Sequence, residues 1–217
     1  MSILVIAEHD NSELKTATLN TVAAGLAIGG DIDILVAGAD CESVAESASQ
    51  IPGVTKVLLA NKETYKNCLA ENIGNLVVEL AEGYTHILSP ATTNGKNFMP
   101  RVAAKLDVSQ VSDISAVISE DTFERPIYAG NCIATVQSTD SVKVITVRTT
   151  GFDACESSGG SATVTAVDND TNAGVSSFVK EEIAELIDSI EKNSNKVHEA
   201  ADVLYHLIVL LEANSIK

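Results

Sequence analysis

Acidic side chains at helical spacing are the residues of this sequence best suited to chemistry. Near the C-terminus the sequence reads EEIAE from Glu181 and EAAD from Glu199. Residues three or four apart share one face of a helix, so either Glu181 or Glu182 lies beside Glu185. Glu199 lies beside Asp202 for the same reason. Together they offer the hard oxygen ligands that Mg²⁺ prefers, and such a metal would polarise a pyrophosphate and activate water for its hydrolysis.

The opposing interpretation is that these carboxylates are solvated faces of two helices. It suits the first helix, where Glu185, Asp188 and Lys192 continue an ordinary exposed stripe. It suits the second helix less well, because Asp202 and His206 interrupt an otherwise apolar run. Polar groups in such a run indicate either a narrow solvent-exposed strip of the helix or a functional site.

A second candidate is the loop PATTNGKN at residues 90–97. It follows a predicted strand and precedes a predicted helix, which is where open α/β sheets place their ligands. Its amides and Lys96 suit an anion at a helix N-terminus, although the P-loop pattern GxxxxGK[ST] is absent. A plain helix cap explains the same residues, and we favour the cap.

The elements that position these candidates alternate between strand and helix over the first 150 residues. Apolar runs predict parallel strands buried on both faces at Ile3–Ala7, Ile32–Ala37, Val57–Ala60 and His86–Leu88. Helical patterns lie between them at Leu14–Ile28, Cys41–Gln50, Lys62–Glu82 and Phe98–Leu106. The sequence therefore predicts an α/β fold, a mostly parallel sheet with helices on both faces.

The pattern changes after residue 112. Short β-branched runs predict further, partly antiparallel strands that extend the sheet or cover its edge, at Ile114–Ser119, Ile127–Ala129, Ile133–Gln137, Val142–Arg148 and Val164–Val167. A polar stretch at Asp168–Ala173 reads as a linker. Amphipathic patterns at Ser176–Glu191 and Val197–Ala213, with a turn at Asn193–Asn195, predict a helical hairpin. We therefore expect two domains, residues 1–175 and 176–217.

Composition excludes several classes of function. The net charge of −16 disfavours nucleic-acid binding, because phosphate backbones repel such a chain. No apolar run approaches the length of a membrane span, and the start of the chain lacks the features of a signal peptide. Four cysteines lie far apart without CxxC spacing. We expect reduced thiols and a cytoplasmic location.

Single histidines and arginines carry less information. His9 and His86 lie at strand ends without ligand-spaced partners, so we expect ordinary satisfied or surface histidines. Arg101, Arg125 and Arg148 are expected to pair with acidic groups inside the domain or at an interface.

Five separated motifs resemble the N-terminal domain of the electron-transfer flavoprotein α-subunit. They are ILVIAEH (3–9), SPATTNGKNFMPRVAAKLD (89–107), VSDI (111–114), RPIYAGNCIA (125–134) and VITVRT (144–149), and they cover about 180 residues in the family's order. The resemblance implies a fold related to adenine-nucleotide α-hydrolases. It also implies a domain that contacts the β-subunit in an αβ heterodimer. It implies FAD as cofactor, but the family holds FAD mainly through a following domain. Nothing after Val179 matches that domain, so we assign no FAD-contacting residue.

Residues 183–217 resemble the C-terminal half of phosphoribosyl-ATP pyrophosphohydrolase, an all-α enzyme of histidine biosynthesis. The resemblance rests on EAADVLYHLIVLL (199–211) and on the EExxE…ExxD pattern. It implies Mg²⁺ ligands at Glu182, Glu185, Glu199 and Asp202, and helical oligomers that supply the helices this segment lacks. A fusion, joined reading frames or chance would each account for the junction.

Three functions remain open from the sequence. The first is a partner-docking electron-transfer subunit without its main FAD domain. The second is a Mg²⁺-dependent pyrophosphohydrolase acting through the C-terminal segment, with a homo-oligomer formed through its helices. The third is an α/β domain with an inactive helical appendage.

Overall fold

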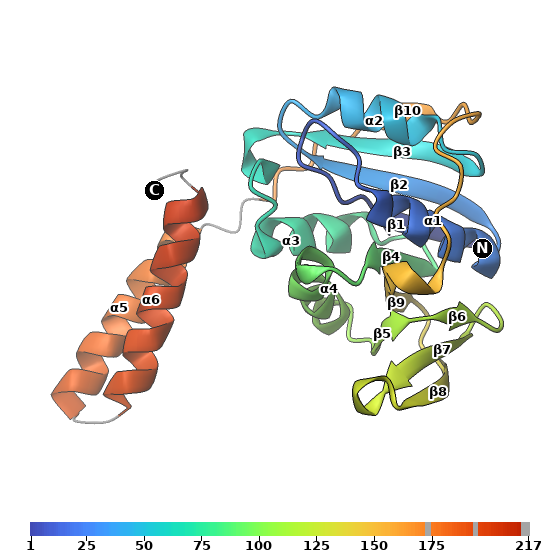
Figure 1. Cartoon of the computed structure of the whole chain (residues 1–217). Coiled ribbons are helices and arrows are strands. Elements are labelled where there is room, and N and C mark those ends of the chain that lie inside the picture. Colours follow the sequence, from blue (N-terminus) through green and yellow to red (C-terminus); the bar gives the residue numbers. More distant parts are fainter. Residues whose placement is uncertain (172–174, 193–194, 214–217) are drawn as a thin grey trace. The chain divides into compact units, whose positions relative to one another are not determined.

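The computed structural model describes residues 1–171, 175–192 and 195–213 (Figure 1). The chain divides into two compact units, Met1–Thr171 and Asn172–Lys217. The first unit is an α/β domain, and the second is a helical hairpin. The fold class predicted from the sequence is confirmed.

A seven-stranded sheet forms the centre of the first unit. Its strands, in spatial order, are β10 (Thr163–Ala166), β3 (Val54–Asn61), β2 (Asp31–Gly38), β1 (Ser2–Ile6), β4 (His86–Pro90), β9 (Lys143–Val147) and β5 (Gln110–Ile114). Every pairing between neighbouring strands is parallel. The order reverses beside β1, so the chain is doubly wound, and the carboxyl ends of β1 and β4 mark the switch point where such folds place ligands.

Alternate residues of the central strands enter two separate cores. Ile3 and Val5 of β1 pack into the core on one face, whereas Leu4 packs into the core on the other face, and all three are fully buried. Successive side chains of a strand point to opposite faces, so a strand between two apolar layers must be apolar at every position. This requirement explains the continuous apolar runs in the sequence.

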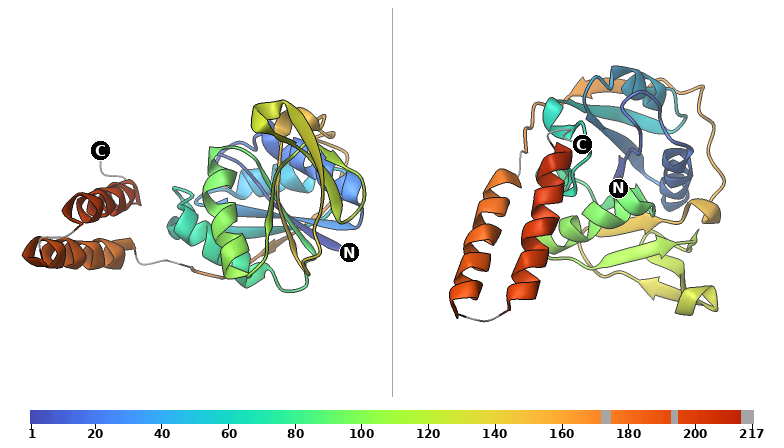
Figure 2. Two further views of the ribbon diagram at one scale, coloured as in Figure 1. Left: turned by 90° about the horizontal axis from the view of Figure 1, so that it is seen from below. Right: turned by 60° about the vertical axis from the view of Figure 1, so that its left-hand side comes forward.

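Helices cover both faces of the sheet (Figures 1 and 2). The first core contains residues of α1 (Thr16–Ile28) and α2 (Glu42–Ser49), and the second contains residues of α3 (Ala70–Leu80) and α4 (Thr93–Lys105). The right-handed connections of parallel strands need such crossover helices.

A small antiparallel sheet lies beside edge strand β5. It contains β6 (Ala116–Val117), β7 (Thr122–Ile127) and β8 (Cys132–Gln137), in that order. Phe123 of β7 is fully buried in the first core, and Val117 and Val136 pack against that core. The small sheet is therefore attached to the domain through its inner face.

Four predicted element bounds are wrong. The strand predicted at Ile114–Ser119 is not continuous, because β5 ends at Ile114 and β6 covers only Ala116–Val117. The helix predicted at Lys62–Glu82 is a 3₁₀ turn, Glu63–Tyr65, followed by α3, because Cys68 has a φ of 48° and breaks the helix. Helix α4 begins five residues before Phe98. The predicted strand at Ile127–Ala129 ends at Ile127, because the following residues form a 3₁₀ turn, Tyr128–Gly130, with positive φ angles. Another 3₁₀ turn, Thr149–Gly151, follows β9.

The second unit consists of α5 (Val175–Lys192) and α6 (Lys196–Ala213), which lie side by side (Figure 2). The predicted turn at Asn193–Asn195 falls partly outside the described residues. Large apolar side chains are exposed on both helices: Ile183, Ile187, Ile190, Val197, Leu204, Tyr205, Leu207, Ile208 and Leu211. Two helices alone give these side chains too little surface to pack against.

Candidate functional site

The loop after β4 is a helix cap. Thr92 is the N-cap of α4, and its side chain accepts a hydrogen bond from the backbone N–H of Gly95 at 3.4 Å. Gly95 lies so close to β4 that an added Cβ would be 2.0 Å from the Pro90 carbonyl oxygen. Thr92 therefore caps α4, and Gly95 lets the start of the helix lie close to β4, which supports the cap interpretation.

The cavity at this switch point is small. Its volume is about 30 Å³, close to the share of one water molecule in the liquid, and its lining includes Glu8, His9, Ser89, Asn94 and Gly95. Oε2 of Glu8 is buried there and has no hydrogen-bond partner. A carboxylate repels anions, so the lining of this small cavity does not favour the phosphates of a nucleotide.

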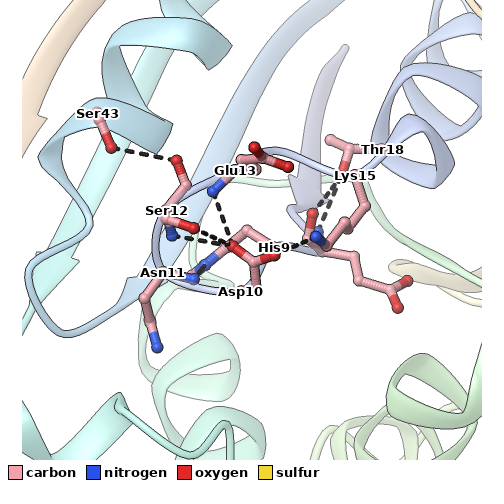
Figure 3. Close-up of polar contacts among 9 residues, drawn as sticks. His9, Asp10, Asn11, Ser12, Glu13, Lys15, Thr18 and Ser43 are labelled. Carbon is pink, nitrogen blue, oxygen red and sulfur yellow. Dashed lines mark hydrogen bonds and ion pairs between the residues drawn. The ribbon is translucent and has the colours of Figure 1, made fainter.

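The loop between β1 and α1 is held by its own polar groups (Figure 3). The Asp10 carboxylate accepts hydrogen bonds from the backbone N–H groups of Ser12 and Glu13, at 3.1 and 2.8 Å, and pairs with Lys15. The hydrogen bond from Lys15, followed by that from the Ser12 hydroxyl, lowers the pKa of Asp10 well below its usual range. Asn11 joins the loop to neighbouring segments, since its side chain accepts a hydrogen bond from Ala39 N–H and donates one to the Lys66 carbonyl.

The two strand-end histidines are buried and satisfied, as the sequence indicates. His9 is 8% exposed, and its Nδ1 accepts a hydrogen bond from Asn11 N–H at 3.1 Å. His86 is 1% exposed, and its Nε2 lies 2.7 Å from the Glu120 carbonyl oxygen. Burial lowers the pKa of both rings, so both are held neutral near pH 7.

Two of the three arginines pair within the domain as expected. Arg101 pairs with Glu71 at 2.9 Å, and Arg148 pairs with Asp113 at 3.0 Å. Within the described residues Arg125 has no ion pair, and its Nε is buried without a partner. For Arg125 the alternative of a partner at an interface stays a prediction.

The hairpin brings together three of the four carboxylates singled out in the sequence. One oxygen each from Glu182 of α5 and from Glu199 and Asp202 of α6 all lie within 4.8 Å of one another. Each of the three side chains is partly buried. Glu185 is exposed and lies outside this group, although it borders the same surface depression as Glu199.

Histidines flank the carboxylate group on both sides. His206 Nδ1 lies 3.4 Å from Glu182 Oε1, and His198 Nε2 lies 3.4 Å from Asp202 Oδ2. The sequence indicates His206 because it continues the Glu199–Asp202 stripe. Our sequence reasoning missed His198, although its i,i+4 spacing to Asp202 was the available signal.

The donor set fits a hard divalent cation. Mg²⁺ binds oxygens at about 2.0–2.1 Å in octahedral geometry, which places two ligand oxygens about 3–4 Å apart. The observed limit of 4.8 Å needs only a small side-chain adjustment to reach that spacing. Glu182, Glu199 and Asp202 would hold the ion, and the ion would supply Lewis-acid activation of a phosphate and of water.

Two family profiles match the chain, and they overlap at residues 161–172. The profile of the electron transfer flavoprotein domain matches residues 3–172. The profile of phosphoribosyl-ATP pyrophosphohydrolase matches residues 161–217, which include the hairpin. Both resemblances identified in the sequence are confirmed.

Curated relatives are electron transfer flavoprotein α-subunits. The chain is 61% identical over 184 residues to that of Pseudomonas aeruginosa, covering 85% of this chain and 60% of the relative. It is 50% identical over 186 residues to that of Paracoccus denitrificans, covering 85% and 60%. It is 51% identical over 174 residues to the mitochondrial α-subunit of Dictyostelium discoideum, covering 76% and 49%.

The fold and these matches define a doubly wound α/β protein with an electron transfer flavoprotein domain. The chain belongs to the electron transfer flavoprotein family, and it is α-subunit-like. It spans about half to three fifths of the length of these relatives. Among the described helices, none has the length and apolar character needed to cross a membrane.

Proposed function

We propose that the α/β domain is the partner-docking domain of an αβ electron carrier and that its partner is an electron transfer flavoprotein β-subunit. The observation that carries this proposal is the family match over residues 3–172. We take residues 1–175 as this functional domain and residues 176–217 as a separate one.

The outer face of the small sheet is the surface that we assign to docking. Ile133 of β8 is 57% exposed on this face, and two apolar residues of the adjoining turns, Ile118 after β6 and Tyr128 after β7, are exposed by 58% and 78%. Ile133 pairs with Pro126 in the next strand, on the side opposite to the buried Phe123. Exposed apolar side chains on the small sheet and its turns support contact with another protein, because such groups gain free energy when a partner covers them.

We also propose that FAD in such a carrier is held by segments other than residues 1–171. The small cavity at the switch point, with the unpartnered Glu8 carboxylate in its lining, supports this part of the proposal. The isolated chain should purify without colour, and stoichiometric flavin absorbance in the visible range would contradict this part of the proposal.

Co-expression with a cognate β-subunit tests the docking proposal. We expect a 1:1 complex by gel filtration with light scattering, lost in Ile118→Glu and Ile133→Glu. Val164→Glu is the matched control, because Val164 is an exposed apolar residue of edge strand β10, in the other sheet. Absence of a complex with the unmodified chain would reject the proposal.

A second function is supported by the carboxylate group of the hairpin. We propose Mg²⁺-dependent pyrophosphate release from phosphoribosyl-ATP, with Glu182, Glu199 and Asp202 as the metal ligands and Glu185 as an outer carboxylate. The exposed apolar side chains of α5 and α6 would pack against a second copy of the hairpin, which would complete a four-helix core.

Pyrophosphate release by the full chain tests this second function. Glu199→Gln or Asp202→Asn should abolish release, and Asp188→Asn should not, since Asp188 pairs with Lys192 at 2.7 Å on α5. No release by the unmodified chain in its oligomeric form would count against it. A monomer at all concentrations would count against the oligomer.

A further inference from the structure

A polar cavity lies between the two sheets of the α/β domain, away from the switch point. Its volume is about 250 Å³, and it is bordered by the start of β5, by β7 and by the segment that follows β8. The polar side chains in its lining include Gln110, Arg125, Gln137, Ser138 and Asp140. Neither the proposed docking face nor the hairpin carboxylates involve this cavity.

Unpartnered polar atoms gather around this cavity. In the described part of the chain four buried side-chain nitrogen or oxygen atoms have no hydrogen-bond partner, and three belong to Gln110, Arg125 and Ser138. Ser138 is only 7% exposed. Most buried polar atoms in proteins are hydrogen-bonded, so three such atoms around one cavity favour a ligand that pairs with them.

Arg125 points toward this cavity because of its register in the small sheet. It lies two residues after Phe123 in β7, and alternate residues of a strand share one face. Phe123 is fully buried toward the domain core, so the Arg125 side chain extends from the inner face. Arg125 is partly exposed as a whole, but its Nε is buried, and within the described residues its charge has no ion-pair partner.

Asp140, the acidic residue in the cavity lining, does not neutralise Arg125. Asp140 lines the cavity, but its Oδ2 accepts a hydrogen bond from Ser109 N–H at 2.9 Å, and within the described residues it forms no ion pair with Arg125. Asp121, on the neighbouring turn, accepts from Gln137 Nε2 at 2.7 Å. The carboxylates around the cavity are thus used in local hydrogen bonds.

We propose that this cavity binds a singly charged carboxylate group. The guanidinium matches a carboxylate in shape and charge, and the Ser138 hydroxyl donates a further hydrogen bond. The Gln110 amide bonds to the Ser112 hydroxyl at 2.9 Å, and its other end faces the cavity as donor or acceptor. Asp140 adds a negative charge to the lining, which penalises a doubly charged phosphate more than a carboxylate.

Titration of the full chain followed by NMR tests the proposal. Sodium acetate is added to about 100 mM at constant ionic strength, because a single carboxylate contact supports millimolar affinity. We expect saturable shifts of the backbone amides at residues 109–111 and 137–140. A parallel titration with inorganic phosphate should give weaker binding.

Variants separate this site from general anion binding. Arg125→Lys should weaken acetate binding about tenfold or more, because the planar fork of donors is lost, and Ser138→Ala should weaken it severalfold. Arg101→Lys is the matched control and should bind as the unmodified chain does. Should Arg125→Lys fail to fold, Ser138→Ala decides the question.

Three results would overturn the proposal. They are absence of saturable shifts in the unmodified chain, unchanged acetate binding in both cavity variants, and phosphate binding as tight as acetate binding.

Discussion

The hairpin of the Asp202→Asn variant should be more stable than the unmodified hairpin in EDTA and less stable than it in Mg²⁺. Asp202 shares a site with Glu182 and Glu199, with oxygens within 4.8 Å of one another. Two charges at that separation repel by about 1 kcal/mol at the dielectric of water and by roughly 3 kcal/mol at an effective dielectric of 20. Because the Asp202 side chain is 39% exposed, the lower value applies.

Without metal, the substitution removes two such repulsions and one weak contact with His198. We therefore expect the Asn variant to be more stable than the unmodified hairpin by about 1 kcal/mol in EDTA. With Mg²⁺ at about a hundred times its dissociation constant, the unmodified hairpin gains about 2.7 kcal/mol, and the variant gains little. The order of stabilities then reverses.

Hydrogen exchange of backbone amides in α5 and α6 measures this effect in the full chain. It reports the local opening of the hairpin, whereas a global melt would mix its unfolding with that of the α/β domain. Asp188→Asn serves as control and should respond to Mg²⁺ as the unmodified chain does. Equal protection by Mg²⁺ in Asp202→Asn and the unmodified chain, or no protection in either, would refute the assignment of these ligands.

Three further predictions concern the α/β domain. Gly95→Ala should destabilise the domain by about 1–3 kcal/mol in urea unfolding, because the new Cβ meets the Pro90 carbonyl oxygen and α4 must shift; an unchanged midpoint would contradict the close packing. The free energy of unfolding should fall as the pH decreases below about 6.5, because burial lowers the folded-state pKa of His9 and His86 and the unfolded chain binds their protons first. His86→Gln should flatten the slope of this free energy against pH. An unaltered slope would be inconsistent with this cause. Iodoacetamide at mildly alkaline pH should label exposed Cys132 before Cys41, Cys68 and Cys155. Burial raises the pKa of the last three thiols, that of Cys41 to about 11. Mass spectrometry of the digested protein gives the order of labelling, and equal labelling rates would contradict this prediction.

The parallel strands were predictable because their sequence signal is a consequence of burial on both faces. Ile3, Leu4 and Val5 must all be apolar when each face of β1 meets a core, and this pattern is visible without a structure. The bounds of α3 and α4 were less accessible. The break at Cys68 depends on a positive φ, and nothing in the local sequence marks a cysteine for that conformation.

The candidate sites show the same division. Helical spacing determined that Glu199 and Asp202 share a face, and EExxE left Glu181 and Glu182 as alternatives on the facing helix. The packing of α5 against α6 brings Glu182 into the group and leaves Glu185 outside it, whereas the side chain of Glu181 lies outside the described residues. Spacing within one helix cannot fix the rotation of a second helix, because that rotation is set by interhelical packing.

By itself the sequence determined the fold class, the family and the acidic residues of the hairpin, because burial patterns and motifs can be recognised within short stretches of sequence. Only the tertiary structure showed that the switch-point cavity is small and that, within the described residues, Arg125 lacks the ion-pair partner found for Arg101 and Arg148. Ion pairs and cavities depend on side chains far apart in the chain, such as those of Gln110, Arg125 and Ser138. Their meeting is decided by sheet register and layer packing, which no local pattern encodes.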